Sequence, residues 1–210
     1  MAGAGENSRA WFPLFLDIAG KPCLVAGGGA VALRKVRLLL SFGAEVKVVA
    51  KEFLPEFQML SAQLCRREVR PGDVSGMTLV VDATGEEEAG LLLQAACREN
   101  RVPLNTVDVL SRCDVIFPAV LRRGELVAAV STGGRSPTAA AWVRDQIDGV
   151  LPRRFEEILE QMGELRAVSR EKFSQPSQRA AWLKGCFLAA AAAGRPLSLE
   201  ELQQISEEEL

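Results

Sequence analysis

The stretch CLVAGGGAVALRK, residues 23–35, decides the fold of this chain. An apolar run breaks at three glycines and continues as a basic amphipathic segment, which predicts a strand over 22–26, a tight turn and a helix over 30–40. Gly27-x-Gly29-x-x-Ala32 has the spacing of the dinucleotide-binding fingerprint. Gly27 permits the turn, and Gly29 lets a pyrophosphate approach the backbone and the open N–H groups of the helix. We therefore expect a dinucleotide phosphate to bind at this turn.

The next segments repeat the alternation of strand and helix. Strands are expected over 45–50, 64–69, 78–83 and 102–107, and a helix over 87–100. The stretch 12–18 alternates loosely and is expected to add an edge strand. This order predicts an α/β fold, a Rossmann-like doubly wound parallel sheet.

The pattern changes after residue 113. Residues 115–121 and 126–131 predict an antiparallel hairpin, and Ser131–Pro137 forms a second glycine loop in which Ser136 is expected to cap a helix that begins at Pro137. From residue 152 onward the apolar spacing is helical. We expect three parts: a dinucleotide-binding domain over 1–113, a small α+β segment over 114–150 and a helical C-terminal domain over 151–210.

Composition excludes several functions. The 210-residue chain is 48% hydrophobic with a net charge of −2, which argues against a nucleic-acid partner. It has no apolar run of membrane-spanning length and no secretory leader pattern, so we expect a cytoplasmic protein with no membrane partner. Histidine and tyrosine are absent, which excludes a serine or cysteine triad and a histidine zinc site, and no metal site is expected. The five cysteines lack C-x-x-C spacing and are expected to be buried thiols.

The candidate cofactor-binding residues lie at the carboxyl ends of the expected strands. They are Gly27, Gly28, Gly29, Ala30, Val31, Lys51, Thr84 and Gly85. The fingerprint expects an acidic residue at the end of the second strand to bind the ribose 2′-hydroxyl. That place reads Val-Ala-Lys-Glu over 49–52. Lys51 could accommodate a 2′-phosphate, and Glu52 lies one or two positions after the expected place of the acidic residue. The residues alone leave NAD and NADP open.

The chain resembles a known family from Phe12 to about Arg170. Four motifs, which occur in the same order along the chain, carry this resemblance. They are FPLFLDIAGKPCLVAGGGAVALRK (12–35), VVDATGEEE (80–88), PLNTVDVLSRCDVIFPAV (103–120) and ELVAAVSTGGRSPTAAAWVRDQI (125–147). A generic dinucleotide-binding protein would share the first and the second motif at most. The chain resembles the precorrin-2 dehydrogenase family, which includes the dehydrogenase/ferrochelatase module of siroheme synthases.

The resemblance implies an NAD-dependent oxidation of precorrin-2, a reduced tetrapyrrole with eight carboxylates, to sirohydrochlorin. The product feeds siroheme and, as an open alternative, cobalamin. It further implies a homodimer formed through 114–150. In some relatives the same site inserts iron, so iron chelation stays open here. Thr132 stands where some relatives carry a serine that is phosphorylated, which leaves such regulation open.

Asp108 is the position associated with catalysis in the family, and it follows an expected strand end, where ligand crevices form. Asn105, Thr132, Gly133 and Arg135 are the candidate substrate-binding residues. Arg135 lies with Arg112, Arg122 and Arg123 in a stretch whose guanidinium groups suit a polycarboxylate.

A non-catalytic module that senses NAD and NADH explains the glycine turn equally well. It gives no account of Asp108 or of the second glycine loop.

Overall fold

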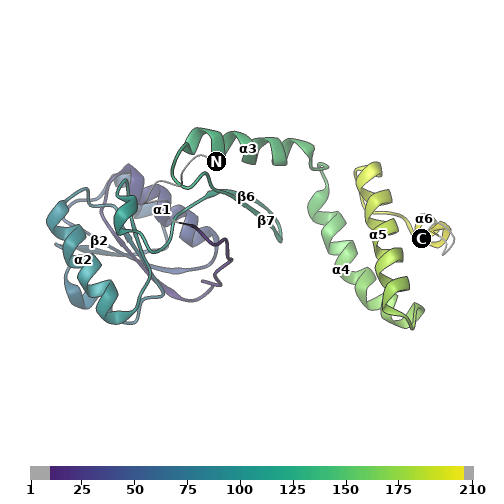
Figure 1. Ribbon diagram of the computed structural model, residues 1–210, viewed down its shortest axis with the longest axis horizontal. Helices are drawn as coiled ribbons and strands as arrows, with labels where there is room; N and C mark the ends of the chain where they lie inside the picture. The colour runs from purple at the N-terminus through teal and green to yellow at the C-terminus, as the bar shows by residue number, and fades with distance from the viewer. Residues whose placement is uncertain (1–9, 206–210) are drawn as a thin grey trace, which may run out of the picture. The chain divides into compact units, whose positions relative to one another are not determined.

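The computed structural model describes residues 10–205. The chain divides into two compact units between Phe117 and Pro118 (Figure 1).

The first unit is built on a five-stranded parallel sheet. Its strands are β1 (Pro22–Ala26), β2 (Glu45–Ala50), β3 (Gln63–Arg66), β4 (Leu79–Asp82) and β5 (Leu104–Thr106). They lie in the order β3-β2-β1-β4-β5, so the direction of winding reverses between β1 and β4. A sheet of this kind opens a ligand crevice beyond the carboxyl ends of the strands at the reversal.

Two helices cover opposite faces of this sheet. Alternate residues of β1 point to opposite sides, so Cys23 and Val25 join the core under α1 (Ala30–Ser41), while Leu24 and Ala26 join the core under α2 (Glu87–Asn100). Figure 1 shows both helices against the sheet. The prediction of a doubly wound α/β sheet is confirmed.

The expected edge strand at the N-terminal end is wrong. Residues 12–18 form no strand, and Phe12, Leu14 and Phe15 are exposed. The Gly20 N–H donates to the Gly43 carbonyl at 2.8 Å, which leads the chain straight into β1. Because β2 and β4 already occupy both sides of β1, the preceding residues cannot pair with β1, the strand that they lead into. The expected strands at β3 and β5 are also shorter than their apolar runs.

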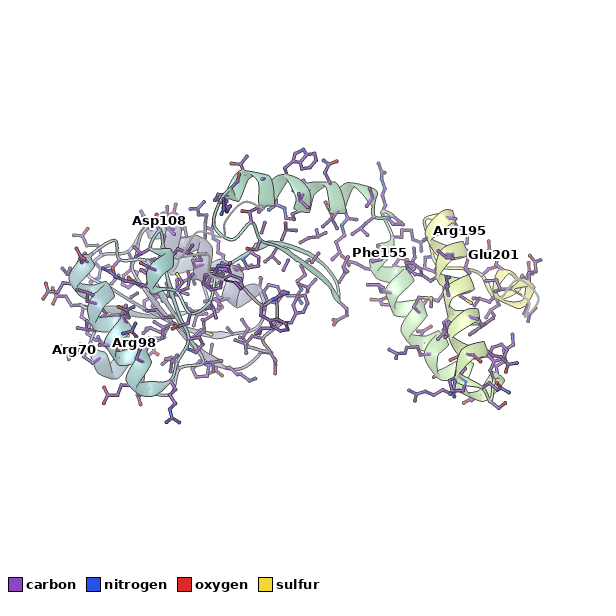
Figure 2. All side chains as sticks on the ribbon, viewed as in Figure 1. Arg70, Arg98, Asp108, Phe155, Arg195 and Glu201 are labelled. Carbon is purple, nitrogen blue, oxygen red and sulfur yellow. The ribbon has the colours of Figure 1, made fainter. Side chains whose placement is uncertain are left out.

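The second unit contains the expected hairpin and helices. The strands β6 (Ala119–Arg123) and β7 (Leu126–Val130) pair antiparallel and are followed by α3 (Pro137–Val150), α4 (Phe155–Lys172), α5 (Pro176–Ala193) and α6 (Leu199–Gln204). The Ser136 hydroxyl accepts the Ala139 N–H at 3.1 Å, which confirms the predicted cap of α3. The α4–α5 pair encloses a small core around Trp182. Arg195 and Glu201, labelled in Figure 2, pair at 2.8 Å.

Burial of the cysteines agrees with the sequence. All five thiols are free, and all but the half-buried Cys65 are buried. Burial raises the pKa of Cys23 to about 11. None of the helices in residues 10–205 is long and apolar enough to cross a membrane.

One buried carboxylate holds the sheet to the turn before β4. The Asp73 carboxylate accepts hydrogen bonds from the Lys47 ammonium at 2.7 Å, the Arg67 guanidinium at 2.6 Å and the Arg70 backbone N–H at 2.9 Å. The Arg67 hydrogen bonds, opposed by burial and aided by Lys47, hold the pKa of Asp73 well below its usual range. Asp73 therefore stabilises the fold only while it is ionised.

We expect Asp73→Asn to lower the free energy of unfolding by about 2 kcal/mol, because Lys47 and Arg67 lose their shared partner but can still reach water. A group with a lowered folded pKa contributes stability above its unfolded pKa and loses it as the pH falls through its folded pKa. Urea titrations should therefore show the gap between wild type and variant closing below about pH 4. Asp17→Asn, at an exposed pair with Lys21, is the control. Equal stability of Asp73→Asn and wild type at neutral pH would refute this role.

Candidate functional site

The first two glycines of the loop are required by close approach of backbones. A Cβ on Gly27 would lie 2.4 Å from the Ala83 carbonyl oxygen, and one on Gly28 would lie 1.9 Å from the Glu52 carbonyl oxygen. Gly27 also has a φ of +121°, which favours glycine. These contacts close the end of β1 against the segments that follow β2 and β4. Gly27 and Gly28 therefore serve the fold itself.

Gly29 differs from both. Its φ is −88°, and a Cβ placed there would meet nothing within 4 Å. It is the N-cap of α1, and no side chain caps that helix end, so the backbone N–H groups around Ala30 and Val31 are open to an anion. Ala32, the third small position of the fingerprint, is fully buried against the sheet. The space beside Gly29 suits a pyrophosphate rather than a protein contact.

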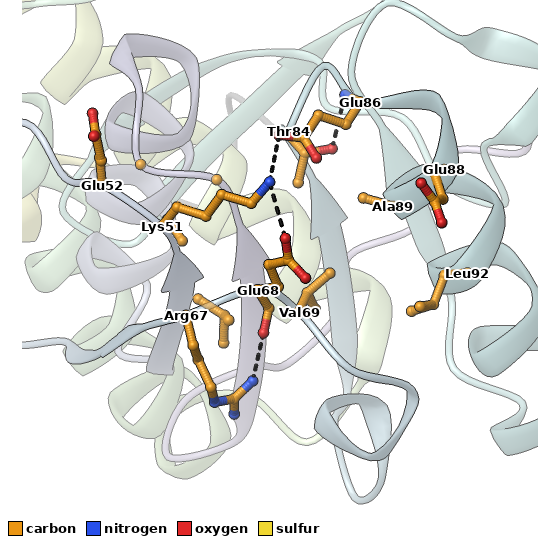
Figure 3. A pocket seen from close by; sticks show the side chains of 14 residues that line it. Lys51, Glu52, Arg67, Glu68, Val69, Thr84, Glu86, Glu88, Ala89 and Leu92 are labelled. Atoms are coloured by element: carbon orange, nitrogen blue, oxygen red, sulfur yellow. Dashed lines mark hydrogen bonds and ion pairs between the residues drawn. The ribbon is translucent and has the colours of Figure 1, made fainter.

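A pocket of about 320 Å³ lies beside this turn (Figure 3). Of the predicted cofactor residues, it is lined by Gly27, Gly28, Lys51 and Thr84. Gly29, Ala30, Val31 and Gly85 are outside its lining. The pocket spans the ends of β1, β2 and β4, where the adenosine half of a dinucleotide lies in this fold.

Lys51 occupies the place of the missing acidic residue. Its ammonium lies 3.1 Å from a Glu68 carboxylate oxygen and 3.5 Å from a Glu86 carboxylate oxygen, as Figure 3 shows. The hydrogen bond to Glu68 and the charges of both glutamates raise the pKa of Lys51. Sequence reasoning singled out Lys51 but missed the two carboxylates, which come from other parts of the chain.

A buried carboxylate, also missed, fixes Thr84. Asp82 ends β4 and is 3% exposed, and its Oδ1 accepts the Thr84 hydroxyl at 2.7 Å and the Thr84 N–H at 3.1 Å. The Thr84 hydroxyl in turn accepts the Glu86 N–H at 3.2 Å. This chain of bonds turns the backbone from β4 toward α2. The signal was present in the motif VVDATGEEE, where an acidic residue ends an apolar strand.

Asp108 lies in the turn that follows β5 (Figure 2). Its residue is exposed, and its φ of +60° is a left-handed conformation that aspartate adopts more readily than most residues. The Val107 N–H donates to the Asp82 carbonyl at 2.9 Å, which sets the start of the turn against β4. Asp108 thus extends past the carboxyl end of the sheet, as expected.

The Asp108 turn is closed by Cys113 and Asn105. The Cys113 thiol accepts the Thr106 N–H at 3.3 Å and donates to the Thr106 carbonyl at 3.2 Å. The Asn105 amide donates to the Val115 carbonyl at 3.0 Å. Asn105 is 6% exposed and holds the two ends of the turn together. The structure gives it a positioning contact, and substrate binding by Asn105 stays a prediction.

The second glycine loop belongs to the second unit. The Thr132 hydroxyl donates to the Ser136 carbonyl and accepts the Ser136 N–H, both at 3.0 Å, so it closes the loop internally. Gly133 has a φ of +63°, and Arg135 is exposed beside it. Substrate binding by Thr132, Gly133 and Arg135 stays a prediction.

Three of the four arginines expected at a polycarboxylate site have partners in the described residues, and one of them is Arg122, whose Nε donates to the Gly124 carbonyl at 3.4 Å. Arg112 pairs with Glu87 at 3.0 Å, and Arg123 pairs with Asp148 at 2.6 Å. Both side chains therefore stabilise local structure. In residues 10–205 no group of three cysteine, aspartate or glutamate side chains could hold a metal ion.

A parallel sheet that reverses at β1 and β4, with a glycine turn that opens an uncapped helix, defines a Rossmann-type dinucleotide-binding protein. Residues 14–119 match the family model whose description reads "Putative NAD(P)-binding", and the chain belongs to this family. The residues around Gly29 fit the pyrophosphate of such a group. The chain therefore binds a nicotinamide dinucleotide.

The chain is similar in sequence to several siroheme synthases. The chain is 35% identical over 206 residues to a siroheme synthase of Ectopseudomonas mendocina, covering 95% of this chain and 44% of that protein. It is 33% identical to siroheme synthase 2 of Aeromonas salmonicida, covering 88% of this chain and 39% of that protein. The chain thus spans less than half the length of these relatives.

A solved structure shares the fold. The precorrin-2 dehydrogenase SirC superposes with a TM-score of 0.73 at 21% identity, covering 95% of this chain and 100% of that one. This match shows the shared fold, and the siroheme synthase relatives bear out the family resemblance of the four sequence motifs.

The contrast between the glycines gives a direct test of the site. We expect Gly29→Ala to fold normally, because its Cβ meets open space, and to weaken NADH binding by at least about tenfold, because the Cβ occupies the phosphate position. Thermal unfolding and a fluorescence titration with NADH measure the two effects. Gly28→Ala should instead lose the fold, and Gly72→Ala, where a Cβ also meets nothing within 4 Å, should change neither. Wild-type affinity in Gly29→Ala would remove the turn from the binding site.

Proposed function

We propose that this chain catalyses the NAD-dependent oxidation of precorrin-2 to sirohydrochlorin, a step in siroheme biosynthesis. The observation that carries the proposal is the pairing of a dinucleotide-binding turn with Asp108 past the end of β5, in a chain related to siroheme synthases. The fold shared with a precorrin-2 dehydrogenase supports it.

The reaction removes two electrons and two hydrogens from the macrocycle. When bound, the nicotinamide ring accepts one hydrogen with its electron pair as hydride. The other hydrogen leaves as a proton, and we assign Asp108 as the group that accepts it at a carboxylate oxygen. Within the part of the chain that the structure describes, the Asp108 side chain makes no ion pair, so its carboxylate is available to a ligand. Gly29 and the start of α1 orient the dinucleotide.

We infer NAD rather than NADP from the charges around the pocket. Its lining carries four glutamates and two basic residues: Glu52, Glu68, Glu86, Glu88, Lys51 and Arg67. Lys51 is already paired with two carboxylates, and Arg67 is bound to Asp73. A 2′-phosphate would therefore meet a net negative surface, whereas a ribose hydroxyl can donate to a carboxylate.

The assembly is proposed to be a homodimer in the cytoplasm, formed through 114–150. Support comes from α3 in this segment, where Trp142 is 63% exposed. Insertion of iron into sirohydrochlorin stays an open second activity, with ferrous ion as a substrate.

The first experiment is anaerobic incubation of the purified chain with precorrin-2 and NAD, followed by absorbance of sirohydrochlorin and NADH. We expect both products to appear together, and Asp108→Asn to lower kcat by roughly 100-fold or more while NADH binding is unchanged. Asparagine suits this variant because it tolerates the left-handed backbone at 108. Glu99→Gln, exposed on α2, is the control.

Measurable NADH binding without turnover of precorrin-2 would contradict the proposed dehydrogenase activity and favour the NAD/NADH-sensing module. Full activity of Asp108→Asn would remove Asp108 from the mechanism. Ferrous ion, added after oxidation is complete, tests chelation through loss of the free-base spectrum.

The choice of cofactor is tested by removing the two carboxylates beside Lys51. We expect Glu68→Gln with Glu86→Gln to tighten NADPH binding by about tenfold, because Lys51 is released to a 2′-phosphate. NADH binding should change much less. Titrations with both dinucleotides measure the ratio, with Glu99→Gln as the matched control. An unchanged ratio would show that these charges do not select the cofactor.

A further inference from the structure

The Asp108 turn is joined to helix α2 by the side chain of Arg112. Arg112 ends the short 3₁₀-helix Leu110–Arg112, which follows Asp108, and its guanidinium pairs with the Glu87 carboxylate at 3.0 Å. The Arg112 side chain is only 17% exposed, whereas that of Glu87 is 80% exposed. A pair with an exposed carboxylate adds little stability, so it does not by itself account for the burial of Arg112.

Gly90 on α2 supplies the second contact of Arg112. Gly90 is buried, and a Cβ placed on it would lie 2.8 Å from Nη1 of Arg112 and 2.9 Å from Oδ2 of Asp82. The guanidinium and the carboxylate therefore both approach the bare backbone of the helix at one point. A side chain at position 90 would take the place of the guanidinium. This need for space explains a glycine within a helix, where glycine is otherwise unfavourable.

The contact point lies between the two halves of the proposed site. Asp82 holds Thr84 through its other oxygen, Oδ1, and Thr84 lines the cofactor pocket. The Arg112 backbone N–H donates to the carbonyl of Val109, the residue after Asp108, at 3.0 Å. One arginine thus connects the carboxylate that fixes the cofactor turn with the turn that carries Asp108.

We propose that Arg112 is a positioning residue, which places the Asp108 turn against α2 and the cofactor turn by lying over Gly90. The inference rests on the proposed function for the reaction that needs this placement. The hydride acceptor and the proton acceptor must both reach one substrate, so the separation of the nicotinamide from the Asp108 carboxylate affects the rate. This role uses the Arg112 guanidinium within the chain and not, as the sequence suggested, for a substrate carboxylate.

Two substitutions separate the charge of Arg112 from its packing. Arg112→Met keeps an apolar stem without the charge, and Arg112→Lys keeps a charge without the planar fork. We expect Arg112→Met to lower kcat for precorrin-2 oxidation by about tenfold, while the KM for precorrin-2 and the affinity for NADH change less than about twofold. Arg112→Lys should recover part of the lost kcat. Anaerobic steady-state kinetics and a fluorescence titration with NADH measure these effects.

The outcomes for Arg112→Met distinguish positioning from two other roles. A higher KM for precorrin-2 with kcat unchanged would overturn the proposal and make Arg112 a substrate-binding residue. Wild-type kinetics, whether or not the melting temperature falls, would also overturn it and leave Arg112 a structural residue.

Gly90→Ala tests the space over the helix. Its Cβ takes the place of Nη1 of Arg112 and presses on Asp82, so we expect a similar loss of kcat together with weaker NADH binding. Gly163→Ala on α4, where a Cβ would meet nothing within 4 Å, is the matched control and should keep wild-type kinetics. Wild-type kinetics in Gly90→Ala would contradict the proposal, because the guanidinium would then not need this space.

A readout without turnover separates this proposal from the proposed function. The N–H groups of Val109 and Cys113 form hydrogen bonds within the Asp108 turn, and their hydrogen exchange, followed by NMR, reports the opening of the turn. We expect both to exchange faster in Arg112→Met, with exchange at Val25 in β1 unchanged. Unchanged exchange in the turn would overturn the proposal. Faster exchange in this variant, together with no oxidation of precorrin-2 by wild type, would refute the proposed function and leave the placement of the turn by Arg112 standing.

Discussion

The absence of side chains at Gly27 and Gly28 is the constraint on which the first unit depends. Both backbones lie so close to neighbouring carbonyls, of Ala83 and Glu52, that a single methyl group would separate β1 from the segments after β4 and β2. The close approach brings three strand ends to one place and aims the start of α1 at the same point. The pocket is therefore a consequence of how the sheet closes at this turn.

The two halves of the proposed site are held by different kinds of interaction. The cofactor half depends on backbone geometry, with uncapped N–H groups at Gly29 and a turn fixed by Asp82. The Asp108 half depends on side chains, since the Cys113 thiol and the Asn105 amide close its turn. Backbone sites tolerate much variation of sequence, whereas the Asp108 turn needs particular polar atoms. This difference explains why the glycine pattern is common to many folds and the 103–120 motif is specific.

The sequence predicted the local elements well where a period or a cap defines them. The helix over 87–100 and the cap at Ser136 were predicted as observed, because both have nearby signals. The expected strand over 12–18 was wrong because a strand needs a neighbour with which to pair, and both sides of β1 are taken by β2 and β4, which no local pattern reveals. The carboxylates around Lys51 were missed for the same reason, since Glu68 and Glu86 reach it only through tertiary structure. Contacts between residues that are distant in the chain could not be predicted from the sequence.

A chain without histidine has few ways to titrate near neutral pH. Burial moves thiols away from that range, as at Cys23, whose pKa rises to about 11. The same burial moves an amine toward it, as at Lys35, whose pKa falls to about 8. Desolvation of a lysine can therefore bring the pKa of a side chain toward neutral pH without histidine. The packing of Phe117 under the Lys35 ammonium supplies that desolvation and an aromatic face for the charge at once.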